Sequence, residues 1–152
     1  MIEKYCLNEI ILPNLPTPHD CIIESISFDD EYLIFNFEKN IARHDSIVYK
    51  GVNLDSLIIR YHLVDPLFDT YLWKLRTSLF RTEGYILINN NKLVDLAQNK
   101  RLEYLHQYIG YESIIIKLFD TSKIMLELNA DFIKYEWIEK KCDLFTARSF
   151  KK

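Results

Sequence analysis

The sequence predicts an α+β protein that is predominantly antiparallel β, a single-domain curved sheet or two-sheet sandwich with one short helix. Residues 22–37 and 114–128 each predict a β-hairpin, because apolar residues alternate with polar ones on both sides of a short turn containing Asp. Only 3 Gly and 4 Pro occur in 152 residues, which favours short loops and no flexible linker. We expect one β-rich domain at 1–140 and a polar tail at 141–152 that frays.

The two hairpins also predict part of the core. Their turns are expected at Asp29-Asp30-Glu31 and at 120–123, where Asp can bond to the local backbone. One face of each strand is then apolar. Together with the last strand, this alternation predicts these core residues: Ile26, Phe28, Leu33, Phe35, Ile116, Leu118, Leu126 and Trp137.

Further strands are expected along the chain. The apolar patch in 1–12 is compatible with an edge strand, and three prolines then favour an extended approach to the first hairpin. A short strand is expected at 47–49, a regular one at 57–63 and another short one at 85–88. The last strand, 132–138, places Ile133, Tyr135 and Trp137 on one face.

Two segments are compatible with both helix and strand. Residues 66–82 could form a helix capped by Asp65, but a strand explains the aromatic residues better, because Tyr71, Trp73 and Leu75 then share one face. Near residue 91, Asn90 or Asn91 could cap a helix.

That helix could end near residue 99 or continue to Gly110. Tyrosines that alternate with polar residues favour a strand at 101–109, so we expect a short helix at about 91–99. It would cover an edge or an end of the sheet.

Composition limits the classes of function. A net charge of −3 argues against a nucleic-acid partner and is compatible with a basic protein partner. The three cysteines have no metal-ligand spacing, and Cys21 is expected to be a buried thiol. No stretch predicts a signal peptide or a membrane span, so we expect a cytoplasmic protein with no membrane contact.

Some motifs carry a resemblance. They are Leu12-Pro13, the run His19-Asp20-Cys21-Ile22-Ile23-Glu24-Ser25-Ile26, Leu33-x-Phe35-x-Phe37, Tyr108-x-Gly110-Tyr111-x-Ser113, Glu127 and Tyr135-x-Trp137. This pattern resembles a group of small β-rich proteins from low-GC Gram-positive bacteria. The resemblance covers most of the chain and implies a fold, but the members of the group share no agreed activity. A looser analogy is with immunity proteins for polymorphic toxins, some of which are β-rich and of similar size.

Two His-Asp dipeptides, His19-Asp20 and His44-Asp45, are similar to the metal-binding dipeptide of HD-type phosphohydrolases. In those enzymes the dipeptide lies on helices with further His and Asp ligands, whereas His19 is expected to begin a strand. Adjacent residues of a strand point to opposite faces and do not easily bind one ion. We therefore expect a structural role for these residues, with no metal and no cofactor.

His62 and His106 lie in predicted strands, and either could act as a general base in a cleft with a carboxylate. A histidine in a strand is more often half-exposed and bonded to a neighbour. The chain has no nucleophile elbow, and with glycine only at 51, 84 and 110 it has no phosphate-binding loop. The sequence therefore favours a protein that is not an enzyme.

Acidic and aromatic residues predict a surface that binds a protein. Asp29, Asp30 and Glu31 could steer a basic partner, and Tyr108 and Tyr111 could anchor it. The leading hypothesis is a non-enzymatic cytoplasmic protein-interaction domain, of the immunity type by the analogy above. The alternative is a small-ligand binder or hydrolytic enzyme with a cleft around His62 or His106. The sequence specifies neither a partner nor an oligomeric state.

Overall fold

The computed structural model describes residues 1–29, 31–39, 41, 54–65, 70–77, 82–89, 91–98 and 101–139. The strands and the helix are β1 (Ile2–Cys6), β2 (Cys21–Phe28), β3 (Tyr32–Phe37), β4 (Leu54–Leu63), β5 (Thr70–Thr77), β6 (Thr82–Ile88), α1 (Asn91–Gln98), β7 (Glu103–Gly110), β8 (Ser113–Phe119) and β9 (Lys123–Glu139). Several predictions lie outside these residues: the strand at 47–49, the tail at 141–152, and the side chains of Asp30, His44, Asp45 and Asn90.

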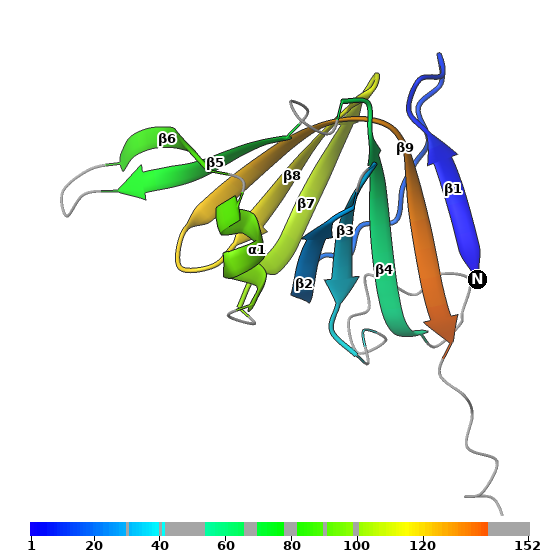
Figure 1. The fold of residues 1–152 in the computed structure, drawn as a ribbon, viewed down its shortest axis with the longest axis horizontal. Helices are drawn as coiled ribbons and strands as arrows, with labels where there is room; N and C mark the ends of the chain where they lie inside the picture. The colour runs from blue at the N-terminus through cyan, green and yellow to red at the C-terminus, as the bar shows by residue number, and fades with distance from the viewer. Residues whose placement is uncertain are drawn as a thin grey trace, which may run out of the picture.

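All nine strands belong to one antiparallel sheet that curves into a ring-like shape (Figure 1). Hydrogen-bonded neighbours follow the order β4-β3-β2-β7-β8-β9, and β9 also pairs with β4, so the path returns to its first strand. β5 and β6 extend from β9 on one side, and β1 pairs with β9 on the other. The predicted fold class is confirmed, and its form is the single curved sheet rather than the two-sheet sandwich.

β9 belongs to both halves of this sheet. Residues up to Asn129 pair with β8 and β5, and residues from Ala130 onward pair with β4 and β1. The prediction of two separate strands, one returning from the hairpin and one at 132–138, is therefore wrong. The register with β4 shifts between His62 and Leu63, which leaves Asp131 as an extra residue on β9. This bulge changes the phase of the alternation, so that one strand has the sequence pattern of two.

Both predicted hairpins are present. Asp29 and Tyr32 close the first turn, since the Asp29 amide donates to the Tyr32 carbonyl at 2.8 Å and the Tyr32 amide donates back at 3.2 Å. The prediction of Phe28 as a core residue is wrong, because its side chain is 41% exposed at the last position of β2. The other seven predicted core residues are buried.

Both ambiguous segments are strands where the structure describes them, as we expected. The face of β5 that is buried is nevertheless the one opposite to Tyr71, Trp73 and Leu75. Leu72 is fully buried opposite Leu126 of β9, whereas Tyr71 is 42% exposed. Pairing with β9 decides the orientation, because it aligns the two buried leucines.

The predicted short helix is α1, and it packs against β2. Leu93 and Ala97, one turn apart, are its buried residues. The Asn89 side-chain oxygen accepts a hydrogen bond of 2.8 Å from the Asn91 amide, so the helix is capped one residue earlier than expected. No helix in the described part of the chain is long and apolar enough to cross a membrane.

Tyrosines from three strands meet inside the ring. The hydroxyls of Tyr61 (β4) and Tyr104 (β7) lie 3.2 Å apart, and Tyr104 donates to the side-chain oxygen of Gln107 at 2.6 Å. The Gln107 amide nitrogen donates to the Tyr135 hydroxyl at 3.1 Å and to the Pro16 carbonyl at 3.1 Å. The Tyr135 hydroxyl also donates to Pro16, at 3.0 Å. This network satisfies polar groups that burial would otherwise leave without a partner.

A register shift between Tyr104 and His106 makes the network possible. It lets Tyr104 and Gln107, three positions apart, point to the same interior. Burial raises the pKa of Tyr61, Tyr104 and Tyr135 well above the ordinary range of a tyrosine, because the phenolate would lose its solvation. The hydrogen bond from Gln107 opposes this rise in the pKa of Tyr135.

Candidate functional site

Backbone hydrogen bonds join four loops and the middle of β9 at one end of the sheet. The Leu63 amide donates to Glu31 at 2.9 Å and the Val64 amide to Asn129 at 3.2 Å. The chain of contacts continues from Ala130 to Glu112 at 3.0 Å, from Glu112 to Leu7 at 3.0 Å and from Leu7 to Asp131 at 2.7 Å. In Figure 1 the segments that follow β1, β4 and β7 lie at the top of the view. We call this surface the acidic end and define it as residues 7–11, 29, 31, 63–65, 111–113 and 129–131.

All the Asp, Glu, Lys and Arg residues of the acidic end are carboxylates. No Lys or Arg occurs in any of its segments. Its carboxylates are Glu9, Asp29, Glu31, Asp65, Glu112 and Asp131. Carboxylates that are not interleaved with cations create a negative potential, which attracts a basic partner over several ångströms.

Exposed apolar side chains lie among these carboxylates. Ile10 is fully exposed and Ile11 is 84% exposed, in the loop that follows β1. Val64 and Tyr111 are 56% and 63% exposed. Apolar side chains of this size, surrounded by charged residues, are typical of a surface that binds another protein.

His62 joins two of the carboxylates. Its Nδ1 lies 2.6 Å from Asp131 and its Nε2 lies 3.6 Å from Glu31. The imidazole stacks on the ring of Phe132, with centroids 4.3 Å apart. Both ring nitrogens face carboxylates of the protein itself, so His62 links the β2–β3 turn to β9 instead of presenting a free nitrogen to a substrate.

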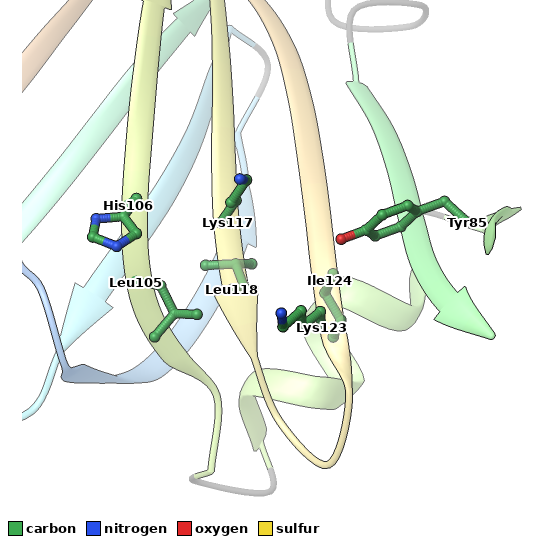
Figure 2. Close-up of a pocket in the computed structure, with 7 residues that line it drawn as sticks. All are labelled: Tyr85, Leu105, His106, Lys117, Leu118, Lys123 and Ile124. Atoms are coloured by element: carbon green, nitrogen blue, oxygen red, sulfur yellow. The ribbon is translucent and has the colours of Figure 1, made fainter. Parts of the chain in front are cut away.

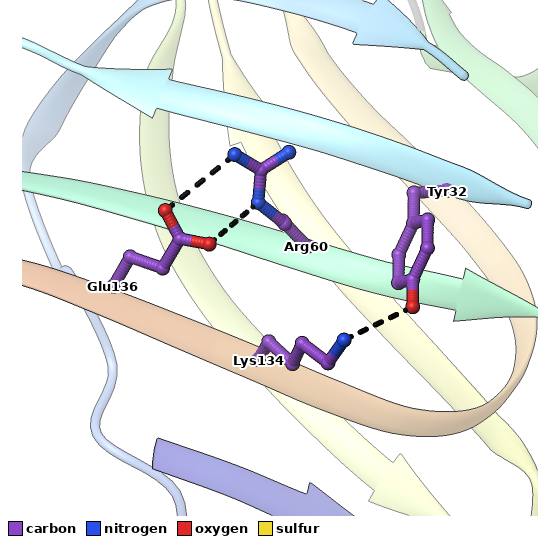
Figure 3. A network of polar contacts seen from close by, with 4 residues as sticks. All are labelled: Tyr32, Arg60, Lys134 and Glu136. Carbon is purple, nitrogen blue, oxygen red and sulfur yellow. Dashed lines mark hydrogen bonds and ion pairs between the residues drawn. The ribbon is translucent and has the colours of Figure 1, made fainter. Parts of the chain in front are cut away.

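The outer face of β3, β4 and β9 has polar contacts of its own next to the acidic end, among Tyr32, Arg60, Lys134 and Glu136 (Figure 3). Arg60 pairs with Glu136, with Nε 2.8 Å from one carboxylate oxygen and a terminal nitrogen 3.5 Å from the other. Lys134 donates to the Tyr32 hydroxyl at 3.1 Å. Lys4 lies 3.6 Å from the centre of the Phe132 ring. These cations contact their own strand neighbours, which fixes the border of the acidic end.

Tyr111 and Tyr108 lie in different surroundings. Tyr111 belongs to the β7–β8 turn and hence to the acidic end, with Asp29 and Glu31. Tyr108 lies on β7, 52% exposed, and its hydroxyl accepts a hydrogen bond of 3.4 Å from Lys117 of β8. The structure therefore places Tyr111 at the acidic end and Tyr108 outside it.

The remaining candidates gather elsewhere. His19 and Asp20 form a turn before β2 instead of beginning the strand, and His19 Nδ1 lies 2.8 Å from the Asp20 carboxylate. The His19 ring lies against His106 of β7, with centroids 4.6 Å apart. Across the described ranges, no group of three or more His, Cys, Asp or Glu side chains has a metal-binding arrangement.

Sequence reasoning missed most of the acidic end. The sequence is compatible with an edge strand in the apolar patch that contains Ile10 and Ile11, but β1 ends at Cys6 and both residues lie exposed in the loop that follows. The signal that could have found them is the absence of Lys and Arg from four separate turn segments and from the middle of β9. Only the pairing of the strands shows that these segments meet.

Comparison of the chain with protein-family models, with curated proteins and with solved structures finds no match, so the functional inference depends on the geometry of the chain itself.

Proposed function

We propose that this chain is a non-enzymatic protein-interaction domain whose acidic end binds a basic surface of another protein. The observation that carries the proposal is that four loops and the bulge of β9 meet at one end, where they contain carboxylates and exposed Ile, Val and Tyr but no Lys or Arg. Carboxylates speed the encounter with a basic partner, and the apolar side chains give up solvent contact on binding.

The kind of partner follows from the same features. A basic protein gains from the negative potential and buries Ile10, Ile11 and Tyr111. An immunity protein that neutralises a basic toxin domain is one version of this function, by the looser analogy of size and β-rich fold. A toxin gene beside the gene for this chain would support that version.

Affinity capture from the native cell, followed by binding kinetics on the captured partner, tests the proposal. One variant removes charge at the acidic end, with Asp29→Asn, Glu31→Gln and Asp65→Asn. A second removes apolar contact, with Ile10→Ser, Ile11→Ser and Tyr111→Ala. The matched control removes three carboxylates elsewhere, with Glu24→Gln, Asp95→Asn and Asp120→Asn.

We expect the first variant to slow association by about ten-fold at low salt, with a smaller effect at high salt. The second variant should weaken binding by about ten-fold or more, mostly through faster dissociation. The control should bind as the natural chain does. A partner that binds all three variants with unchanged kinetics would show that the acidic end is not the site.

A further inference from the structure

A concave site lies on the other half of the sheet, away from the acidic end. It is a cavity of about 310 Å³ lined by Tyr85, Leu105, His106, Lys117, Leu118, Lys123 and Ile124 (Figure 2). The Tyr85 side chain reaches from β6 toward β9, and His106 lies at the opposite side of the cavity. Strands β6, β7, β8 and β9 all contribute to it.

The register of the strands brings its basic side chains together. His106 faces Lys117 directly across β7 and β8. Lys117 faces Met125 and Phe119 faces Lys123, so the two lysines are diagonal neighbours on one face of the β8–β9 pair. Diagonal neighbours lie about 7–8 Å apart at their backbones, close enough for long side chains to reach one ligand.

Lys117 and Lys123 have no carboxylate partner among the described residues. None of the described residues that line the cavity is a carboxylate. Lys117 donates to the hydroxyl of Tyr108 at 3.4 Å and lies 4.9 Å from the centre of its ring, and both of these groups are uncharged. Glu103 and Glu127 lie on the neighbouring strands, but neither forms an ion pair with Lys117 or Lys123 in the described structure. Two ammonium groups in one cavity repel each other unless an anion lies between them.

We propose that this cavity binds a small phosphate monoester. A monoester carries a charge of about −1.5 to −2 at neutral pH, which matches two lysines better than a carboxylate does. Lysine binds phosphate as a point charge without demanding one geometry. His106 and the Tyr85 hydroxyl add hydrogen-bonding groups, while Leu105 and the Tyr85 ring provide apolar surface for the organic part of the ligand.

Calorimetric titration at constant ionic strength tests this site, with phenyl phosphate, inorganic phosphate and benzoate as the probes. We expect phenyl phosphate to bind most tightly and benzoate least. Lys117→Gln and Lys123→Gln should each weaken binding of phenyl phosphate by about ten-fold or more. The matched control is Lys39→Gln, at an exposed lysine outside the cavity, and it should bind as the natural chain does.

Tyr85→Leu separates the two sources of phosphate. It should weaken binding of phenyl phosphate but not of inorganic phosphate if the organic group lies against the ring. Thermal unfolding without ligand checks that each variant is folded. Absence of binding by the folded natural chain at millimolar phenyl phosphate, or equal binding by all three lysine variants, would overturn the proposal. Neither result would affect the acidic end, because the two sites share no residue.

Discussion

The side chain of Phe35 packs against residues of two other strands. It is fully buried on β3, and its ring makes edge contacts with Tyr61 of β4 and Tyr104 of β7, with centroids 5.4 Å and 6.4 Å apart. Phe28, on the neighbouring strand, is 41% exposed. The same residue type therefore occupies two very different environments.

Phe35→Ala should lower the free energy of unfolding by about 3–5 kcal/mol, because it removes a buried ring and leaves a cavity. Phe28→Ala is the matched control and should have an effect of about 1 kcal/mol or less. Urea unfolding of both variants measures the difference. Equal stability of the two variants would show that the register of the β2–β3 hairpin differs from the one described.

The buried tyrosines predict a loss of stability in alkali. Because their pKa values are raised in the folded state, Tyr61, Tyr104 and Tyr135 keep their protons while the unfolded chain loses them above about pH 10. Below that pH both states are protonated and stability does not depend on these groups. Above it, each tyrosine lowers the free energy of unfolding by up to about 1.4 kcal/mol per pH unit.

Urea unfolding between pH 9 and about pH 11.5 measures this slope. Tyr135→Phe should remove up to a third of it, whereas Tyr111→Phe, at an exposed turn position, should leave it unchanged. A slope that Tyr135→Phe does not reduce would contradict the burial of its hydroxyl.

At the scale of the single strand or helix, the sequence pattern predicted the features that depend only on neighbouring residues. The hairpins, the strand nature of β5 and β7, and the short helix follow from period-two patterns, turn residues and a cap. The face of β5 did not follow, because Leu72 and Tyr71 are both apolar and only pairing with Leu126 decides between them. The length of β9 was missed for the related reason that a bulge interrupts the pattern.

The bulge at Asp131 sets which face each half of β9 presents. Deleting Asp131 removes the extra residue, so the buried positions on its two sides, such as Ala130 and Ile133, then alternate without interruption and keep their face. We expect this variant to keep cooperative unfolding and the near-ultraviolet circular dichroism of packed aromatic rings. Deletion of Lys134, in the regular part of β9, is the matched comparison and should lose both properties, because it turns Tyr135 away from the core. Loss of cooperative unfolding in the Asp131 deletion, or its retention in the Lys134 deletion, would contradict this account of the bulge.

For the whole molecule, the acidic end could not be predicted, because its segments come from five parts of the chain that only the sheet order brings together. The same order predicts where the ring is weakest. β2 and β7 pair over two positions, Cys21 with Tyr104 and Ile22 with Glu103, whereas β8 and β9 pair over seven.

Hydrogen exchange should therefore be faster at this β2–β7 junction than in the centre of the β8–β9 pair. The reporters are the Ile23 amide, which donates to Leu102 at 2.8 Å, and the amides of Ile116 and Leu126. Few bonds hold the junction, so local opening there requires less free energy. Slower exchange at Ile23 than at Leu126 would show that other contacts, such as those of α1 with β2, hold the ring closed.

The double membership of β9 also has a consequence for the order in which the protein folds. β1, β4, β5 and β8 all use β9 as a neighbour, and all of them precede it in the chain. The amino group of Met1 donates to the carbonyl of Trp137, a contact between residues 136 positions apart. Contacts of such long range slow folding toward the range of milliseconds to seconds. During synthesis these four strands therefore have an unpaired edge until β9 has left the ribosome, and only then can the sheet be completed.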